Sequence, residues 1–75
     1  MSRLPSLTAR QVIRALKRAG FLEDRRRGSH AIFFHPQTGA RTVVPVHAGK
    51  TIKEPLLRSM IRDAGMTVEE FLSLL

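Results

Sequence analysis

The sequence predicts an α+β fold in which helices cover one face of a three-stranded antiparallel sheet, in the order α-β-β-β-α. The first and last parts of the chain carry apolar residues at helical spacing, whereas the middle carries short apolar runs separated by turn residues. A chain of 75 residues can bury one small core. We therefore expect a single domain over residues 1–75.

The first helix is predicted to begin after Thr8 and to end at Gly20. Thr8 and Gln11 have the spacing of a capping box, and glycine adopts the left-handed conformation that ends many helices. One helix face is apolar, with Ala9, Val12, Ile13 and Leu16 at helical spacing. The basic residues lie off that face and are expected to meet solvent or an anion: Arg10, Arg14, Lys17 and Arg18.

Three strands are predicted next. Residues 21–27 form a charged, peripheral strand, and residues 30–35 form the central strand, with apolar residues on both faces. Residues 36–39 make a hairpin loop, and residues 41–46 form the third strand. Because Pro45 has no N–H donor, the third strand is expected at a sheet edge or to end there.

A second helix is predicted to begin at Thr51, because Thr51 and Glu54 have the spacing of another capping box. Pro55 falls early enough in this helix to be tolerated, and Gly65 ends it. Its buried face is predicted to comprise Ile52, Leu56, Met60, Ile61 and Ala64.

A short final helix follows Thr67, which has Glu70 at the third position of another capping box. This helix carries Phe71, Leu72 and Leu75. Ile32, Phe33 and Phe34 are expected to be mostly core residues, and Phe71-Leu72 is expected to dock on that core. The complete layout is that of double-stranded-RNA-binding domains, with the second face of the sheet open. A layout does not by itself determine a function.

The charge of the chain favours a polyanionic partner. Thirteen Lys and Arg residues against six Asp and Glu give a formal net charge of +7, which suits nucleic acid, an anionic membrane surface or an acidic protein. With four Phe and neither Tyr nor Trp, an extensive base-stacking platform is not expected. The sequence has no cysteine, no evident signal peptide and no apolar run long enough for a membrane span, so we expect a cytoplasmic protein.

The most informative motif is Gly28-Ser29-His30, which places a turn and a titratable side chain beside a cluster of arginines. Histidine can take and give a proton near neutral pH, and Arg25, Arg26 and Arg27 offer the forked donors that suit phosphate. A second histidine, His47, follows the third strand, and Lys50 follows soon after. This combination suggests chemistry on a phosphodiester.

Each candidate residue also has a purely structural interpretation. His30 could be an inert residue at a strand edge, and His47 could be an acid–base partner, a phosphate contact or a support for its loop. Lys50 suits a phosphate next to the amides at the start of the second helix, but it could equally be a solvated lysine. Ser29 is a turn residue rather than a nucleophile, because no carboxylate–histidine relay accompanies it. The spacing of His30, His35 and His47 matches no zinc pattern, so no metal or other cofactor is expected.

The ordered set of motifs resembles the HicA family of toxins, which are small mRNA interferases of toxin–antitoxin pairs. The resemblance covers nearly the whole chain and rests on Ala19-Gly20-Phe21, Gly28-Ser29-His30, Val44-Pro45-Val46-His47, Gly49-Lys50, Asp63-Ala64-Gly65 and Glu70-Phe71-Leu72. It implies a fold like that of double-stranded-RNA-binding domains. It also implies that His30 is catalytic and that a HicB-type antitoxin covers the active site.

The sequence and the resemblance together predict a metal-independent endoribonuclease that acts on mRNA, with His30 and His47 as its catalytic residues. The residues expected to contact RNA are Arg25, Arg26, Arg27, Ser29 and Lys50. The main alternative is a non-catalytic RNA-binding module, which the fold and the charge would serve equally well. A third possibility is a DNA-binding adaptor in a repressor complex. His30 separates the first two, because only the nuclease needs its imidazole for cleavage.

Overall fold

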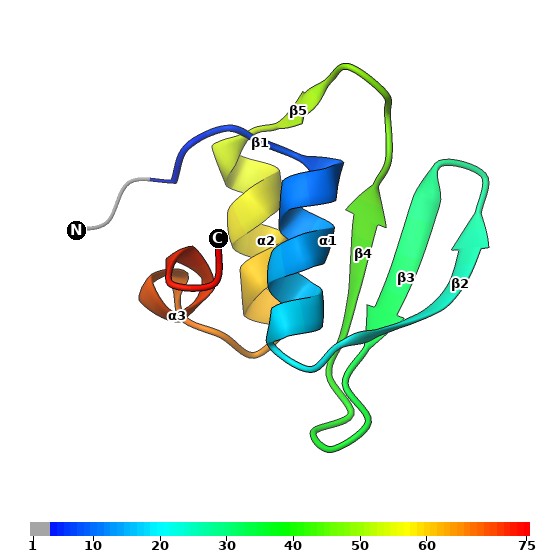
Figure 1. The fold of residues 1–75 in the computed structure, drawn as a ribbon, viewed down its shortest axis with the longest axis vertical. Coiled ribbons are helices and arrows are strands. Elements are labelled where there is room, and N and C mark those ends of the chain that lie inside the picture. Colours follow the sequence, from blue (N-terminus) through cyan, green and yellow to red (C-terminus); the bar gives the residue numbers. More distant parts are fainter. Residues whose placement is uncertain (1–3) are drawn as a thin grey trace.

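The computed structural model describes residues 4–75 and consists of a helical layer beside a three-stranded sheet (Figure 1). Figure 1 shows α1 (Ala9–Arg18) and α2 (Glu54–Asp63) side by side next to β4 (Arg41–Pro45), with α3 (Val68–Leu72) on the far side of the two longer helices. The α-β-β-β-α layout is confirmed. Residues 1–3 lie outside the described residues. They belong to the N-terminal segment in which the sequence shows no evident signal peptide.

Helix α1 begins and ends where the sequence predicts. The backbone N–H of Gln11 donates to Thr8 Oγ1 at 3.2 Å, and the N–H of Thr8 donates to Gln11 Oε1 at 2.9 Å, which completes the capping box. Gly20 follows the helix with a φ of +100°. The buried face comprises Ala9, Val12, Ala15 and Leu16, while Ile13 is only partly buried.

The main sheet has the strand order β2-β3-β4, with β2 spanning Leu22–Arg27 and β3 spanning His30–Phe34. The register of β2 against β3 shifts between Glu23 and Arg25, so β2 contains a bulge. Every residue of β2 is exposed, as expected for a charged, peripheral strand. Pro45 is the last residue of the edge strand β4, where its missing N–H leaves no gap inside the ladder.

The core lies between the sheet and the helices. Phe33 of β3 and Val44 of β4 are fully buried, whereas Ile32 and Phe34 are only half-buried. Of Ile32, Phe33 and Phe34, all expected to be mostly core, only Phe33 is fully buried, because side chains alternate between the two faces of a strand. The hydroxyl of Thr42, on β4, donates to the carbonyl oxygen of Met60 at 3.1 Å and so links the sheet to α2.

The predicted start of the second helix is wrong. Thr51 lies in a short strand, β5 (Thr51–Ile52), which pairs antiparallel with β1 (Leu7–Thr8), and α2 begins only at Glu54 with Lys53 as its N-cap. A cap at Thr51 would place Pro55 at the fourth helical position, where its absent N–H would lose the first intrahelical bond and its ring would clash. In the observed helix Pro55 occupies the first turn, where no N–H is needed.

This later start also changes which residues of the helix are buried. Leu57 is fully buried, whereas Leu56, predicted to be buried, is 46% exposed. Ile52 is buried as predicted, but from β5 rather than from the helix.

Helix α3 has the predicted capping box. The N–H of Glu70 donates to Thr67 Oγ1 at 3.1 Å, and the N–H of Thr67 donates to Glu70 Oε1 at 2.8 Å. Phe71 is buried in the core, Leu72 packs partly against it, and Leu75 is 39% exposed. Among residues 4–75, no helix is both long and apolar enough to cross a membrane.

Candidate active site

The residues predicted to carry the chemistry gather at the end of the sheet where β3 begins and β4 ends. His30 is the first residue of β3 and lies opposite Arg27 on one neighbouring strand and Pro45 on the other. The carbonyl oxygen of Ser29 accepts a hydrogen bond of 2.6 Å from the N–H of Val46, the residue before His47. This bond holds the Gly28-Ser29 turn against the chain that leads to His47.

The side chain of His30 is available to a ligand. It is exposed, while the next residue, Ala31, is fully buried, so the alternation along β3 places His30 on the face of the sheet away from the helices. Within residues 4–75 its imidazole forms no hydrogen bond or ion pair. The ring can therefore meet a substrate without first breaking a contact.

Two of the three predicted arginines share the face of His30. Arg27 is opposite His30 and Arg25 is opposite Ile32, and residues paired across antiparallel strands project to the same face. Arg26 instead pairs with Ala31, and its Nε lies 3.4 Å from a carboxylate oxygen of Glu23. The arrangement thus places two guanidinium groups beside the histidine and directs the third elsewhere.

His47 and Lys50 lie in the loop between β4 and β5, and both are exposed. They line a shallow hollow of about 330 Å³ together with Arg10 and the start of α1. His30 does not line this hollow. The structure therefore brings the two histidines to one end of the sheet without placing them in a common pocket.

The expected position of Lys50 beside the start of the second helix is wrong, because β5 separates it from α2. The first turn of α1 lines the hollow instead. Arg10 is the residue that the sequence analysis did not assign to the site. From the sequence, Arg10 could only be placed off the apolar face of its helix. Its position near His47 depends on the pairing of β1 with β5, which draws α1 and the His47 loop together and was not predicted.

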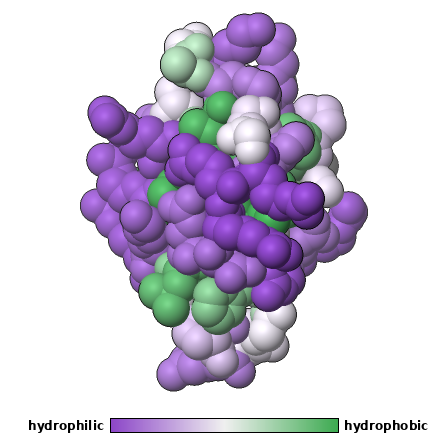
Figure 2. All heavy atoms as spheres, turned by 90° about the vertical axis from the view of Figure 1, so that its right-hand side faces the viewer, coloured by the Kyte–Doolittle hydropathy of each residue, from purple (hydrophilic) through white to green (hydrophobic). Residues whose placement is uncertain are grey.

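The open face of the sheet is apolar between its cations. Leu22 is 53% exposed and Val43 is 43% exposed. The guanidinium of Arg41 lies 5.8 Å from the ring centre of Phe34. Figure 2 views the side on which β2 and β3 lie and shows patches of hydrophobic surface separated by hydrophilic surface. A partner on this face would meet both apolar and positively charged groups.

The third histidine, His35, is held by contacts within the fold and so has a structural role. Its Nε2 lies 3.1 Å from the carbonyl oxygen of Ala19, and its ring meets that of Phe21 edge-on with centroids 5.1 Å apart. Within residues 4–75 no three His, Cys, Asp or Glu side chains cluster closely enough to hold a metal ion.

The fold and this site define a small basic α+β domain with an exposed histidine at the end of its sheet. Residues 9–66 match the family model described as the HicA toxin of bacterial toxin–antitoxin pairs. The chain therefore belongs to the HicA toxin family, as its sequence motifs predict. It is a toxin of the toxin–antitoxin type, and membership of the family implies an antitoxin as its partner. A comparison with curated protein sequences found no match.

Proposed function

We propose that this toxin is an endoribonuclease that cleaves mRNA, with His30 as a general acid/base. The observation that carries the proposal is the exposed imidazole of His30, which has no partner within residues 4–75 and faces the same side as Arg25 and Arg27. Membership of the HicA family supports the same assignment. The net charge of +7 favours an RNA substrate.

The chemistry is a transesterification at phosphorus. A base takes the proton of a ribose 2′-hydroxyl, and that oxygen attacks the adjacent phosphorus as the bond to the 5′-oxygen breaks. An acid returns a proton to the departing oxygen, which leaves a 2′,3′-cyclic phosphate on one fragment and a 5′-hydroxyl on the other. In this scheme His30 supplies the base or the acid, and the arginines stabilise the charge of the phosphorane. DNA lacks the nucleophile and is not cleaved.

The second acid–base group and the remaining contacts are assigned by position. His47 is exposed at the same end of the sheet and is proposed as the partner of His30. Lys50, in the same hollow as His47, is proposed to contact a phosphate. Arg26 adds to the field of the basic strand, and Ser29 positions the turn through its carbonyl oxygen.

The antitoxin partner is proposed to be of the HicB type and to cover His30. The open face of the sheet that carries His30 also presents the exposed side chain of Val43, opposite Ile32. At the other end of β3 it presents the exposed side chains of Leu22 and Arg41. An antitoxin surface with acidic and aromatic groups would complement this combination, and opposite charge would speed the encounter.

The test is to incubate wild-type protein and the His30→Ala variant with a defined RNA in EDTA and to map the fragment ends. We expect cleavage by the wild type with cyclic phosphate and 5′-hydroxyl ends, and a rate lower by about 10²–10⁴ in the variant. Arg62→Gln, an exposed change on α2, serves as the control for loss of charge elsewhere and should cleave normally. Circular dichroism confirms that all proteins are folded.

Cleavage by a folded His30→Ala protein at the wild-type rate would contradict the assignment of His30. RNA binding without cleavage by the wild type would instead favour a non-catalytic RNA-binding module. An RNA with a single ribose among deoxynucleotides should be cut only after that ribose, which tests the 2′-hydroxyl mechanism directly.

A further inference from the structure

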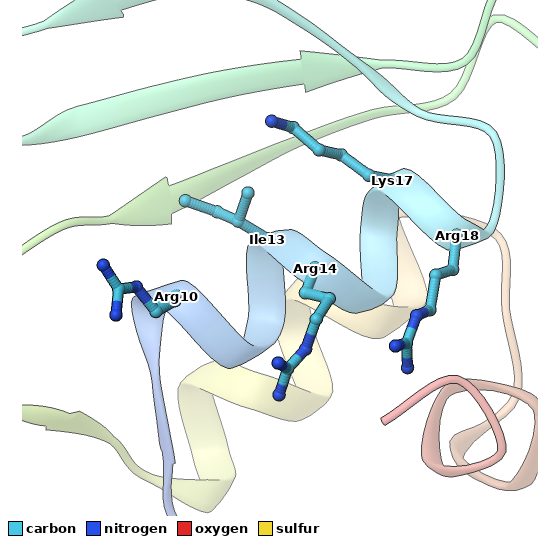
Figure 3. A pocket seen from close by; sticks show the side chains of 5 residues that line it. All are labelled: Arg10, Ile13, Arg14, Lys17 and Arg18. Carbon is cyan, nitrogen blue, oxygen red and sulfur yellow. The ribbon is translucent and has the colours of Figure 1, made fainter.

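The outer face of α1 is a basic surface that the proposed chemistry does not use. Its lining residues surround a shallow groove of about 430 Å³ and comprise Arg10, Ile13, Arg14, Lys17 and Arg18 (Figure 3). Figure 3 shows Ile13 and Lys17 pointing towards the strands, while Arg14 and Arg18 point to the other side of the helix. The cations therefore flank the one half-buried apolar residue between them.

These cations are not neutralised within residues 4–75. The ion pairs in this part of the chain join Arg26 to Glu23, Arg41 to Asp24 and Arg58 to Glu54, and none of them involves a residue of α1. Among the described residues, Arg18 is the one cation of this face whose side chain forms a hydrogen bond. It donates to the carbonyl oxygen of Leu74 at 2.8 Å, which leaves its charge uncompensated. Helix α1 itself contains no acidic residue.

The positions of the basic residues on α1 do not stabilise the helix itself. Arg10 lies in the first turn, where the helix dipole favours negative rather than positive groups. Arg10, Arg14 and Arg18 recur every fourth residue, and like charges at that spacing destabilise a helix by about 0.2–0.5 kcal/mol per pair. A bound polyanion would relieve this repulsion.

The basic face is continuous with the candidate active site. Arg10 lines both the α1 groove and the hollow that contains His47 and Lys50. Residues four apart on a helix advance by about 6 Å along its axis. That separation is close to the distance between successive phosphates of an RNA strand, so Arg10, Arg14 and Arg18 can meet phosphates in succession.

We propose that the outer face of α1 binds the phosphate backbone of single-stranded RNA and holds the substrate beyond the scission site. The strand runs from the end of the sheet at His47, past Arg10, towards the end of α1 at Arg18. Ile13 gives a sugar or base an apolar contact between the charges. This inference rests on the proposed function for its choice of RNA as the ligand.

The experiment measures RNA binding in a His30→Ala background, so that cleavage does not interfere. The probe is a fluorescent single-stranded oligouridylate, and its dissociation constant is measured at several salt concentrations. The test variant is Arg14→Gln/Arg18→Gln, which removes two of the three arginines proposed to meet successive phosphates. The matched control is Arg58→Gln/Arg62→Gln, which removes the same two charges from the exposed side of α2.

We expect the α1 variant to lower the slope of log K against log salt by about 1.4, since each lost phosphate contact on a single strand contributes roughly 0.7. Its affinity at 0.1 M salt should fall by at least about tenfold. The control should change the slope much less, because its charges lie away from the strand. Equal changes in the two variants would overturn the proposal by showing that net charge alone determines binding.

The same proteins with His30 restored separate this inference from the proposed function. If wild-type protein binds RNA through α1 but never cleaves it, the nuclease proposal fails and the α1 surface stands. If wild-type protein cleaves RNA while the α1 variant binds and cleaves like the control, only the α1 surface is overturned. If the α1 variant binds RNA normally but binds poly-glutamate more weakly than the parent protein does, the α1 proposal is also overturned. That result would indicate that the outer face of α1 binds an acidic protein instead.

Discussion

Nε2 of His35 lies 3.1 Å from the carbonyl oxygen of Ala19, and this contact joins the chain just after β3 to the end of α1. The other ring nitrogen, Nδ1, accepts hydrogen bonds from the N–H groups of Gln37 at 3.2 Å and Thr38 at 3.3 Å. Because Nδ1 accepts, the proton of the neutral ring is on Nε2, which donates to Ala19. One imidazole thus fixes the β3–β4 loop and the end of the first helix.

Replacing His35 should therefore destabilise the fold. We expect His35→Ala to lower the free energy of unfolding by about 2–3 kcal/mol, because three hydrogen bonds and the packing on Phe21 are lost. His35→Asn should lose less, since its amide oxygen can still accept from the loop. Urea unfolding measures both, and equal stability of His35→Ala and wild type would refute this structural role.

Gly20 is required by the same contact. A Cβ at Gly20 would lie 2.8 Å from Nε2 of His35, and the residue has a φ of +100°. Gly39 is a matched control, with a φ of +78° and nothing within 4 Å of its added Cβ. Both alanine variants have a left-handed backbone cost of about 1–2 kcal/mol, but only Gly20→Ala also displaces the imidazole. Thermal unfolding should show the larger loss for Gly20→Ala, and a reversed order would contradict this account.

His47 gives a prediction about activity. If it is the acid–base partner of His30, His47→Ala should lower the cleavage rate at saturating RNA by about 10²-fold or more and change RNA affinity little. Lys50→Gln, in the same hollow, should instead weaken RNA binding and its salt dependence. Single-turnover kinetics separate the two effects. A purely structural His47 would appear as lower stability without a selective loss of rate.

Much of the fold follows from local signals in the sequence. The capping boxes at Thr8 and Thr67 set the starts of α1 and α3, because the hydrogen bonds involve residues only three apart. The strands and the hairpin turn at Gly28 follow from alternation and turn chemistry. The positions of His30 and Arg27 at one end of the sheet could be anticipated for the same reason.

The features that sequence reasoning missed depend on contacts distant in the chain. Thr51 and Glu54 have the spacing of a capping box, yet pairing of Thr51 with Thr8 keeps that segment extended. The same pairing draws Arg10 towards Lys50 and creates the hollow beside His47. No local pattern specifies a two-residue strand pair, so this part of the site was not predictable. The helix start did have a local signal, because Pro55 fits the first turn of a helix and not its fourth position.

The shifted start of α2 can be tested by its buried side chains. Leu57 is fully buried, whereas Leu56 is 46% exposed. Leu57→Ala should lower the free energy of unfolding by about 2–5 kcal/mol, since it removes buried methyl groups and leaves a cavity. Leu56→Ala, the same chemical change one residue earlier, should alter it by about 0.5 kcal/mol or less. Denaturant titration measures the free energy of unfolding of both variants. A larger loss of stability for Leu56→Ala would contradict the observed burial and would favour a helix that begins after Thr51, in which Leu56 is buried.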